Sequence, residues 1–438
     1  MTTQPAAYND SSKPGQVLLY FAPLTLLVYL VLPHGYLLDI TTSHMLKNQL
    51  HASATQVATF RLMTAIPVYF SFVFGLSRDL WNPLGLRDRG FFLIFASVTA
   101  AVFIWMALSS LSYRGLLVGM LLVMLSFRFV SAAYQALIAL VAQERLMSGR
   151  LSALWTIVSF LPYIFGAFAS GYITEHLPPS QTFVLVAALT LLIALLGLWK
   201  PRSVFNHTYD QPQAKGADFL GDVKPLLKHR AVYPAVLIIH VSVRAWVKYA
   251  LAVLLTNELH ASDAVFSYFT GIFLASFIPV LLLYGYLCKK VALNKLLWYG
   301  MIITAPQMVP LAFLHSANLA LVLAVPMGLM GGIAAAVIYD LAMRSWPPGL
   351  QGTLMMMVDG AYQLSYRGGD VVGSWIYGSS PAHGFAYCVI ATTVIYALIL
   401  PVLVLVPKAL IATADAEPNP QIESKVLAKI AETAPAAR

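Results

Sequence analysis

Long uninterrupted apolar runs dominate this chain, and short segments rich in charge, proline and glycine separate them. Each run holds about twenty residues, the length at which a helix crosses about 30 Å of hydrocarbon. The runs are continuous rather than alternating, which predicts helices instead of barrel strands. Six runs precede a polar stretch at residues 200–230 and six follow it. The predicted spans are residues 17–38, 55–77, 90–111, 115–142, 151–173, 181–199, 231–255, 264–287, 295–314, 318–342, 353–378 and 384–407.

Composition agrees with this pattern. The chain is 59% hydrophobic and 10% charged, with a mean hydropathy of +0.75, whereas soluble domains are about 25% charged. The first run is too long for a signal peptide, follows a single basic residue, Lys13, and ends without a small-residue cleavage site. We therefore predict an all-α membrane protein with 12 transmembrane helices in two six-helix halves.

The basic residues set the orientation. With the N-terminus in the cytoplasm, the inside segments hold 20 Lys and Arg residues, and the outside loops hold only Lys47 and Arg114. By the positive-inside rule, both termini are then cytoplasmic, and we expect a multi-pass protein of the plasma (inner) membrane. The formal charge of +9 is explained by topology, so it does not indicate a nucleic-acid partner.

The same pattern predicts the domain organisation. We expect a cytoplasmic N-terminus at 1–16, a six-helix bundle at 17–199, a cytoplasmic linker at 200–230, a second bundle at 231–407 and a cytoplasmic tail at 408–438. The tail, rich in alanine, proline and charge, is expected to be poorly ordered. The charged turn from Gly75 to Gly90 has a degenerate echo from Gly285 to Lys295, a glycine followed by a basic turn, as tandem transporter halves often have.

Six plus six helices, a basic central loop and the G-x-x-x-D…R-x-R turn between spans two and three resemble the major facilitator superfamily. That resemblance implies a transporter in which Gly75, Asp79, Arg87 and Arg89 latch span two to span eleven at the cytoplasmic face. Physically, a helix that begins at Gly352 or Thr353 presents free N–H groups that Asp79 can cap. The alternative is a basic turn that only sets topology.

A narrower resemblance is to the folate-biopterin transporter branch. It rests on LPHGYLLD (Leu32–Asp39), the run from Pro67 to Asp79, SGRLSALW (Ser148–Trp155) and PPGLQGTLMMMV (Pro347–Val358). The chain departs from the branch at Ser71 and Phe72, where the branch carries Lys-Pro. The resemblance implies a folate- or pterin-like substrate.

Charges inside the predicted spans mark the candidate site. An ionisable side chain at mid-bilayer costs roughly 2.5 to 3.5 kcal/mol, so it needs a partner, water or a function. The third, sixth, ninth and twelfth spans hold none well inside the membrane; in the family resembled, these four helices are peripheral and the others line a central cavity. We expect that cavity to be cationic or neutral, which suits an organic anion or zwitterion. The candidate substrate-binding residues are Arg61, Arg128, His240, Arg244, Lys248 and Arg367.

On span seven, His240, Arg244 and Lys248 follow one another at i, i+4 and i+8, which places them in one stripe along the helix. The stripe could bind an anion. Alternatively, Lys248 reaches the interface and Arg244 pairs with an acid on a neighbouring helix.

On span eleven, Asp359 and Asp370 share a helix face and are the candidate proton-coupling carboxylates. Arg367 and Asp370, at i and i+3, can neutralise each other. Asp359 has no basic residue at i±3 or i±4, so it must meet Arg244 or Lys248 across the bundle, bind a proton, or open to water. Elsewhere, Asp39 could reach Arg61, and Asp340 is expected to pair with Arg344.

These patterns predict a proton-coupled secondary active transporter of a small organic anion or zwitterion, working by alternating access. The alternatives are a drug or metabolite exporter of the same fold and a non-transporting assembly factor or sensor. Phosphate loops, zinc-protease motifs and nucleophile elbows are absent from the sequence, so we expect no enzyme activity, no cofactor and no metal. Cys288 and Cys388 are expected near opposite membrane faces, inert. The expected partners are the substrate and the bilayer, with the protein a monomer.

Overall fold

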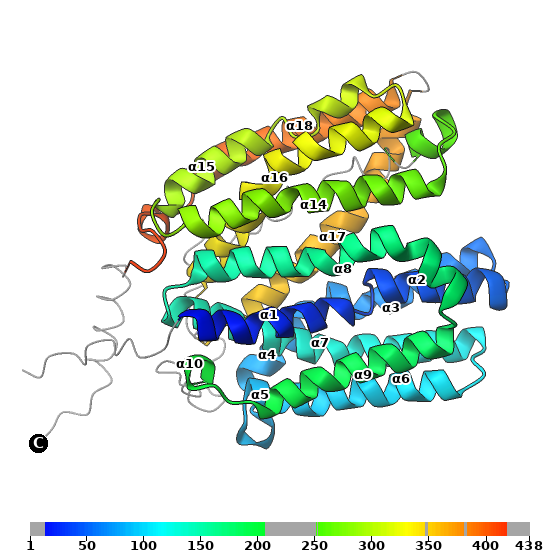
Figure 1. The fold of residues 1–438 in the computed structure, drawn as a ribbon, viewed down its shortest axis with the longest axis horizontal. Helices are drawn as coiled ribbons and strands as arrows, with labels where there is room; N and C mark the ends of the chain where they lie inside the picture. The colour runs from blue at the N-terminus through cyan, green and yellow to red at the C-terminus, as the bar shows by residue number, and fades with distance from the viewer. Residues whose placement is uncertain (1–13, 206–250, 252, 347–348, 381–382, 418–438) are drawn as a thin grey trace, which may run out of the picture.

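The computed structural model describes residues 14–205, 251, 253–346, 349–380 and 383–417 of the 438. Within these residues the regular structure is helical throughout, and long helices run side by side along the long axis of the molecule (Figure 1). The predicted all-α architecture is thereby confirmed for the described part of the chain.

The first half contains five of the long membrane helices and a broken first span. Its α-helices are α1 (Pro14–Leu30), α2 (Tyr36–His44), α3 (Ala54–Tyr69), α4 (Ser71–Leu80), α5 (Asp88–Phe91), α6 (Ser97–Leu108), α7 (Tyr113–Glu144), α8 (Ser148–His176), α9 (Pro179–Leu198) and α10 (Arg202–Phe205), joined by η1 (Met45–Gln49), η2 (Pro83–Gly85) and η3 (Phe92–Ala96). The first predicted span is wrong in detail, because the helix breaks at residues 31–35 and resumes as α2. Span two is kinked at Phe70, where the backbone leaves helical geometry between α3 and α4.

The second half follows the predicted spacing closely. Its elements are η4 (Leu254–Glu258), α14 (Asp263–Leu287), α15 (Leu293–Thr304), η5 (Val309–Phe313), α16 (Ala317–Ser345), α17 (Gln351–Gly378), α18 (Gly384–Leu403) and α19 (Lys408–Ile411). Most of the predicted linker, 200–230, and of span seven, 231–255, lies outside the described residues.

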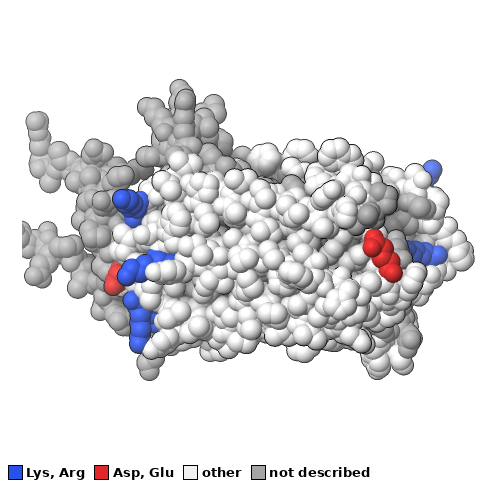
Figure 2. Space-filling model, turned by 90° about the horizontal axis from the view of Figure 1, so that it is seen from above, with Lys and Arg blue, Asp and Glu red and all other residues white. Residues whose placement is uncertain are grey.

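Nine helices in the described ranges are long and apolar enough to cross a membrane. α17 is not among them, since it carries Asp359, Arg367 and Asp370 along its middle. Figure 2 shows Lys, Arg, Asp and Glu gathered at the two ends of the molecule, with a broad uncharged belt between them. This belt matches a protein that crosses the bilayer several times.

The two ends of the helix bundle are called the latched end and the open end. The latched end holds the turns at residues 81–87, 145–147 and 288–292 together with residues 346, 349 and 350, and the open end holds those at 50–53, 109–112, 259–262 and 314–316. In Figure 1 the latched end lies to the left, beside α10 and α19. Residues 408–417 belong to it and pack on the bundle: Ile411, Ala414 and Asp415 are buried. The prediction of a poorly ordered tail is therefore wrong for its first ten residues.

Close helix contacts hold the two halves together at glycines. A Cβ on Gly75 of α4 would stand 2.3 Å from the carbonyl oxygen of Gly352 at the start of α17. In the other half, Gly285 of α14 faces Ala153 of α8, with the corresponding Cβ at 3.5 Å. The echoing glycines therefore lie at equivalent crossings, α4 with α17 and α14 with α8.

Candidate functional site

A cavity of about 630 Å³ lies between the halves, on the open side of the molecule. Its walls come from α1, α2, α3, α7 and α8 of the first half and from α14, α16 and α17 of the second. Within the described residues, α6 and α9 contribute nothing to it, and α18 contributes only Tyr396. The segment around η5, by contrast, lines it with Thr304, Gln307, Met308 and Leu311, so span nine is less peripheral than its lack of charge suggests.

The described lining is balanced in formal charge. It contains three arginines and three aspartates: Arg61, Arg128, Arg367, Asp39, Asp359 and Asp370. Any excess of positive charge depends on His240, Arg244 and Lys248, which lie outside the described residues. The sequence predicted a cavity that is either cationic or neutral, and the described part of its wall is neutral.

Asp359 meets a residue of the opposite half. Its carboxylate accepts a hydrogen bond of 2.7 Å from Nη1 of Arg128, on α7. Arg128 is 1% exposed, and its Nε is buried without a hydrogen-bond partner among the described residues. The sequence left three alternatives for Asp359: Arg244 or Lys248 across the bundle, a bound proton, or water. Arg244 and Lys248 lie outside the described residues, and the basic partner across the bundle is Arg128, which was not predicted for this pair. The pair couples the two halves at the floor of the cavity.

Two other predicted pairs inside the membrane, Arg367 with Asp370 and Arg61 with Asp39, are not formed. Arg367 and Asp370 make no ion pair with each other; Arg367 lies 5.8 Å from the ring centroid of Tyr366, and Asp370 interacts with another group. Helix spacing brings them to adjacent positions, but the side chains turn to different neighbours. Arg61 donates to Oγ of Ser43 at 3.3 Å and does not pair with Asp39. All four side chains line the cavity.

At the latched end, Asp79 caps the first turn of α17. Its Oδ1 accepts from the backbone N–H of Gly352 at 3.1 Å, and its Oδ2 accepts from both the N–H and the hydroxyl of Thr353 at 2.7 Å. Arg78 holds the carboxylate in place at 3.1 Å and forms a two-point pair with Asp88, at 2.6 and 2.7 Å. These bonds satisfy free N–H groups and place negative charge at the positive end of the helix dipole.

Further polar contacts close this end around Gln143 of α7. Its amide nitrogen donates to the carbonyl oxygens of Met343 and Trp346 at 2.6 and 2.7 Å, and its amide oxygen accepts from Gln351 at 3.0 Å. The expected Asp340–Arg344 pair is confirmed at 2.7 Å, and Arg344 also donates to Ser148 of the first half. Nothing in the sequence signals Gln143, whereas Arg78 and Asp88 stand in the charged turn itself.

A sequence model described as the Major Facilitator Superfamily matches residues 35–366, most of the chain. The chain belongs to the Major Facilitator Superfamily. Its members are membrane transporters rather than enzymes. No curated protein sequence matches the chain. The folate-biopterin branch receives no support from the family match.

Solved structures of this superfamily share the fold. FucP in its outward conformation superposes with a TM-score of 0.66 at 15% identity, covering 88% of this chain and 97% of FucP. A point variant of the E. coli fucose:proton symporter FucP superposes with a TM-score of 0.66 at 16% sequence identity, covering 89% of this chain and 98% of FucP. The human organic anion transporter MFSD10 (TETRAN) superposes with a TM-score of 0.62 at 14% sequence identity, covering 90% of this chain and 100% of MFSD10. At such identities the likeness concerns the fold alone.

Arg89 and Arg87 are the two arginines predicted for the latch of this superfamily fold. The hydrogen bonds of the Arg89 side chain and of the Arg87 backbone lie inside their own half, and the Arg87 residue has a further interaction. Arg89 donates to the carbonyl oxygens of Gly197 and Leu198 at 2.8 and 3.1 Å, capping the end of α9. The backbone N–H of Arg87 donates to Oδ1 of Asn82 at 2.7 Å, and its φ is +53°, so this residue shapes the turn. Of the four residues predicted for the latch, Gly75 and Asp79 are the ones with a described contact to the other half.

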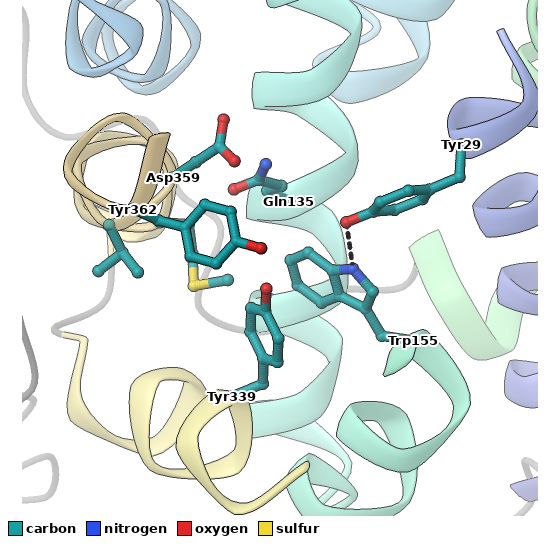
Figure 3. Close-up of a pocket in the computed structure, with 8 residues that line it drawn as sticks. Tyr29, Gln135, Trp155, Tyr339, Asp359 and Tyr362 are labelled. Atoms are coloured by element: carbon teal, nitrogen blue, oxygen red, sulfur yellow. Dashed lines mark hydrogen bonds between the residues drawn. The ribbon is translucent and has the colours of Figure 1, made fainter. Parts of the chain in front are cut away.

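Aromatic side chains lie to one side of Asp359, with Tyr362 next to it and Tyr339, Trp155 and Tyr29 farther away (Figure 3). The hydroxyl of Tyr29 accepts from Nε1 of Trp155 at 2.7 Å, and the Trp155 ring stacks on Tyr339 with centroids 4.9 Å apart. Tyr362 and Gln135 complete a void of about 20 Å³, enough for about one water. Sequence reasoning did not single these residues out, because tyrosine and tryptophan are common wherever membrane helices pack.

Proposed function

We propose that this chain is a secondary active transporter in which the halves 17–199 and 231–407 rock about the central cavity. The cargo is a small organic anion or zwitterion, and movement is coupled to protons through Asp359, with Asp370 as a second carboxylate on the same wall. The observation that carries this proposal is the Arg128–Asp359 ion pair, which links the halves at the cavity floor.

The coupling follows from the cost of a buried unpaired charge. Removing one partner of a buried pair costs about 3 to 5 kcal/mol, because the other charge remains desolvated. Separation of the two halves at the Arg128–Asp359 pair is therefore unfavourable until another negatively charged group replaces Asp359 beside Arg128. A carboxylate of the substrate can take the guanidinium, and a proton can neutralise the released Asp359. Each event alone leaves one charge unmatched, so the two are favoured together.

The lining supports the proposed class of substrate. Three arginines and three aspartates face the cavity, which suits a molecule carrying both signs or a single anion that displaces Asp359. The tyrosines and Trp155 at the floor offer flat apolar faces, so a planar ring bearing a carboxylate, as in folate- or pterin-like molecules, fits best. Human MFSD10, which shares the fold, is described as an organic anion transporter, which makes this class the first to test.

We further propose that the latched end is cytoplasmic. The predicted inside segments carry 20 Lys and Arg residues against two outside. In that orientation the cavity faces outward, Gly75 and Asp79 form the closed gate, and Arg87 and Arg89 shape its turn. We propose that the protein acts as a monomer in the plasma (inner) membrane, because one chain provides both the cavity and the gate.

Uptake into proteoliposomes tests the proposal. A mixed pool of organic acids, amino acids and pterins is offered with and without an inward proton gradient, and internal solutes are identified by mass spectrometry. We expect carboxylate-bearing solutes to accumulate, and the gradient to increase that accumulation. If none enters under either condition, the transporter proposal is wrong.

Asp359→Asn tests the coupling. The variant is expected to lose the increase caused by the proton gradient while retaining exchange of internal for external substrate, because the proton site is gone and the cavity remains. Asp39→Asn is the matched control, since Asp39 lines the same cavity and makes no ion pair with a described residue. Gradient-driven uptake that survives in Asp359→Asn would assign coupling to another group.

A further inference from the structure

The turn that echoes Gly75–Gly90 lacks an acid. In the first half, Asp79 follows Gly75 by four residues and caps the helix that the glycine contacts. In the second half, the residue four after Gly285 is Lys289, and the segment from Gly285 to Lys295 contains no Asp or Glu. A lysine is unfavourable near the positive end of a helix dipole, so α8, the helix that Gly285 contacts, needs its cap from elsewhere.

Asp415, from beyond the last span, occupies that place. Its Oδ1 accepts from the backbone N–H of Gly149 in the first turn of α8 at 3.1 Å, and its Oδ2 pairs with Nε of Arg150 at 2.7 Å. The Asp415 side chain is fully buried, and that of Arg150 is 13% exposed. The next residue continues the contact, as the N–H of Ala416 donates to the carbonyl of Leu146 at 2.9 Å.

The same short segment, Thr413–Ala416, is also fixed to the second half, and we call it the C-terminal strap. The N–H of Asp415 donates to the carbonyl of Cys288 at 2.8 Å, directly beside Lys289. The carbonyl of Thr413 accepts from Arg344 at 2.9 Å and from the N–H of Leu293 at 3.3 Å. The strap therefore carries its acid from the second half to the helix of the first half.

We propose that Asp415 is a positioning residue of the gate, supplying to α8 the cap that Asp79 supplies to α17. The latched end is then closed by two caps of the same kind, one on each side of the repeat, and the strap must leave α8 for this end to open. The inference rests on the proposed alternating access, because only a chain that opens this end needs a releasable cap.

Cys288 provides a native reporter beneath the strap. Its side chain is 1% exposed, and a Cβ on Gly149 would stand 2.7 Å from that of Cys288, so the thiol lies at the contact between the halves. Burial raises the pKa of the Cys288 thiol to about 12, which keeps it unreactive at neutral pH while the strap is in place. Opening exposes it to a maleimide.

The test compares two thiols in one purified full-length protein. Ala65→Cys places a reporter on the cavity wall, and peptide mass spectrometry follows its labelling and that of Cys288 separately. With Asp415→Asn we expect Cys288 to be labelled about five- to tenfold faster, because the variant loses the charge that pairs with Arg150 and one of the two carboxylate acceptors. The introduced cavity thiol should be labelled more slowly, because opening one end closes the other. Asp415→Glu should restore both rates.

The control is Glu417→Gln, which removes a charge close to the strap. Among the described residues, its carboxylate accepts only from the N–H of Ala414 in the strap itself, so both rates should stay unchanged. Two results would overturn the proposal: unchanged Cys288 labelling in Asp415→Asn, or faster labelling of both thiols, which would mean general loosening. Neither readout needs substrate, so the strap is tested independently of transport.

Discussion

Nη1 of Arg128 on α7 and Oδ2 of Asp359 on α17 lie 2.7 Å apart, although 231 residues separate them in the chain. The arginine is buried and the carboxylate side chain is 23% exposed to the cavity. The two halves therefore share one ion pair at the point where the cavity ends. Its partners have different surroundings, so losing one is not equivalent to losing the other.

The first prediction concerns this asymmetry. Arg128→Met removes the buried charge and leaves Asp359 at the cavity wall, where water can solvate it, whereas Asp359→Leu leaves Arg128 buried and unpaired. We expect Asp359→Leu to reduce stability by about 3 kcal/mol and Arg128→Met by less. Arg128→Met/Asp359→Leu should recover most of the loss, because an apolar pair has no charge to desolvate. Thermal unfolding in detergent measures all three; equal losses in the two single variants would contradict the asymmetry.

The second prediction concerns the crossing of α4 and α17. Gly75→Ala would place a Cβ 2.3 Å from the carbonyl oxygen of Gly352, so one helix must move away. Such overpacking typically costs about 1 to 3 kcal/mol, and the latched end should open, with faster maleimide labelling of Cys288. Gly368→Ala on α17 is the control, since a Cβ there meets nothing within 4 Å. A gate unaffected by Gly75→Ala would show that the close approach is dispensable.

Much of the fold could be predicted because hydrophobic length is a local signal. The predicted span 264–287 corresponds to α14 at Asp263–Leu287, and the span beginning at 384 corresponds to α18. The first span failed because its apolar run continues through Gly35, where the backbone is extended, and nothing in hydropathy distinguishes a helix from a broken one.

The site was predictable only where a local rule applied. The contact of Asp79 with the start of α17 follows from the acid in the turn and from the helix beginning at Gly352 or Thr353. The partner of Asp359 lies on another helix, and its choice depends on how α7 and α17 are rotated, which helical spacing alone does not determine. Asp415 was missed because the composition around it is typical of disorder, while its burial depends on contacts with distant turns.

The third prediction separates the two roles found within the charged turn. Asp79→Ala removes the acceptors for the N–H groups of Gly352 and Thr353, so hydrogen exchange at the start of α17 should accelerate about tenfold, the effect of about 1 to 2 kcal/mol. Arg89→Gln weakens the cap of α9 in the same half and should leave exchange in α17 unchanged. If both variants accelerate exchange in α17 equally, the turn acts as one unit and Asp79 has no separate function.

The fourth prediction uses the Cys288 thiol, whose pKa is raised to about 12 by burial. A raised thiol pKa favours the neutral form, so the closed protein presents almost no thiolate at a pH of about 8. If labelling requires opening, the reacting species is the thiolate of the exposed cysteine, so the rate should rise about tenfold per pH unit and level off near the ordinary thiol pKa of about 8.5. Reaction in the closed state would instead keep rising beyond a pH of about 10. The measurement is the pH profile of Cys288 labelling in the wild type and in Asp415→Asn. Both profiles should level off at the same pH and differ only in the maximal labelling rate. The reason is that the variant changes how often the latched end opens and leaves the chemistry of the exposed thiol unchanged.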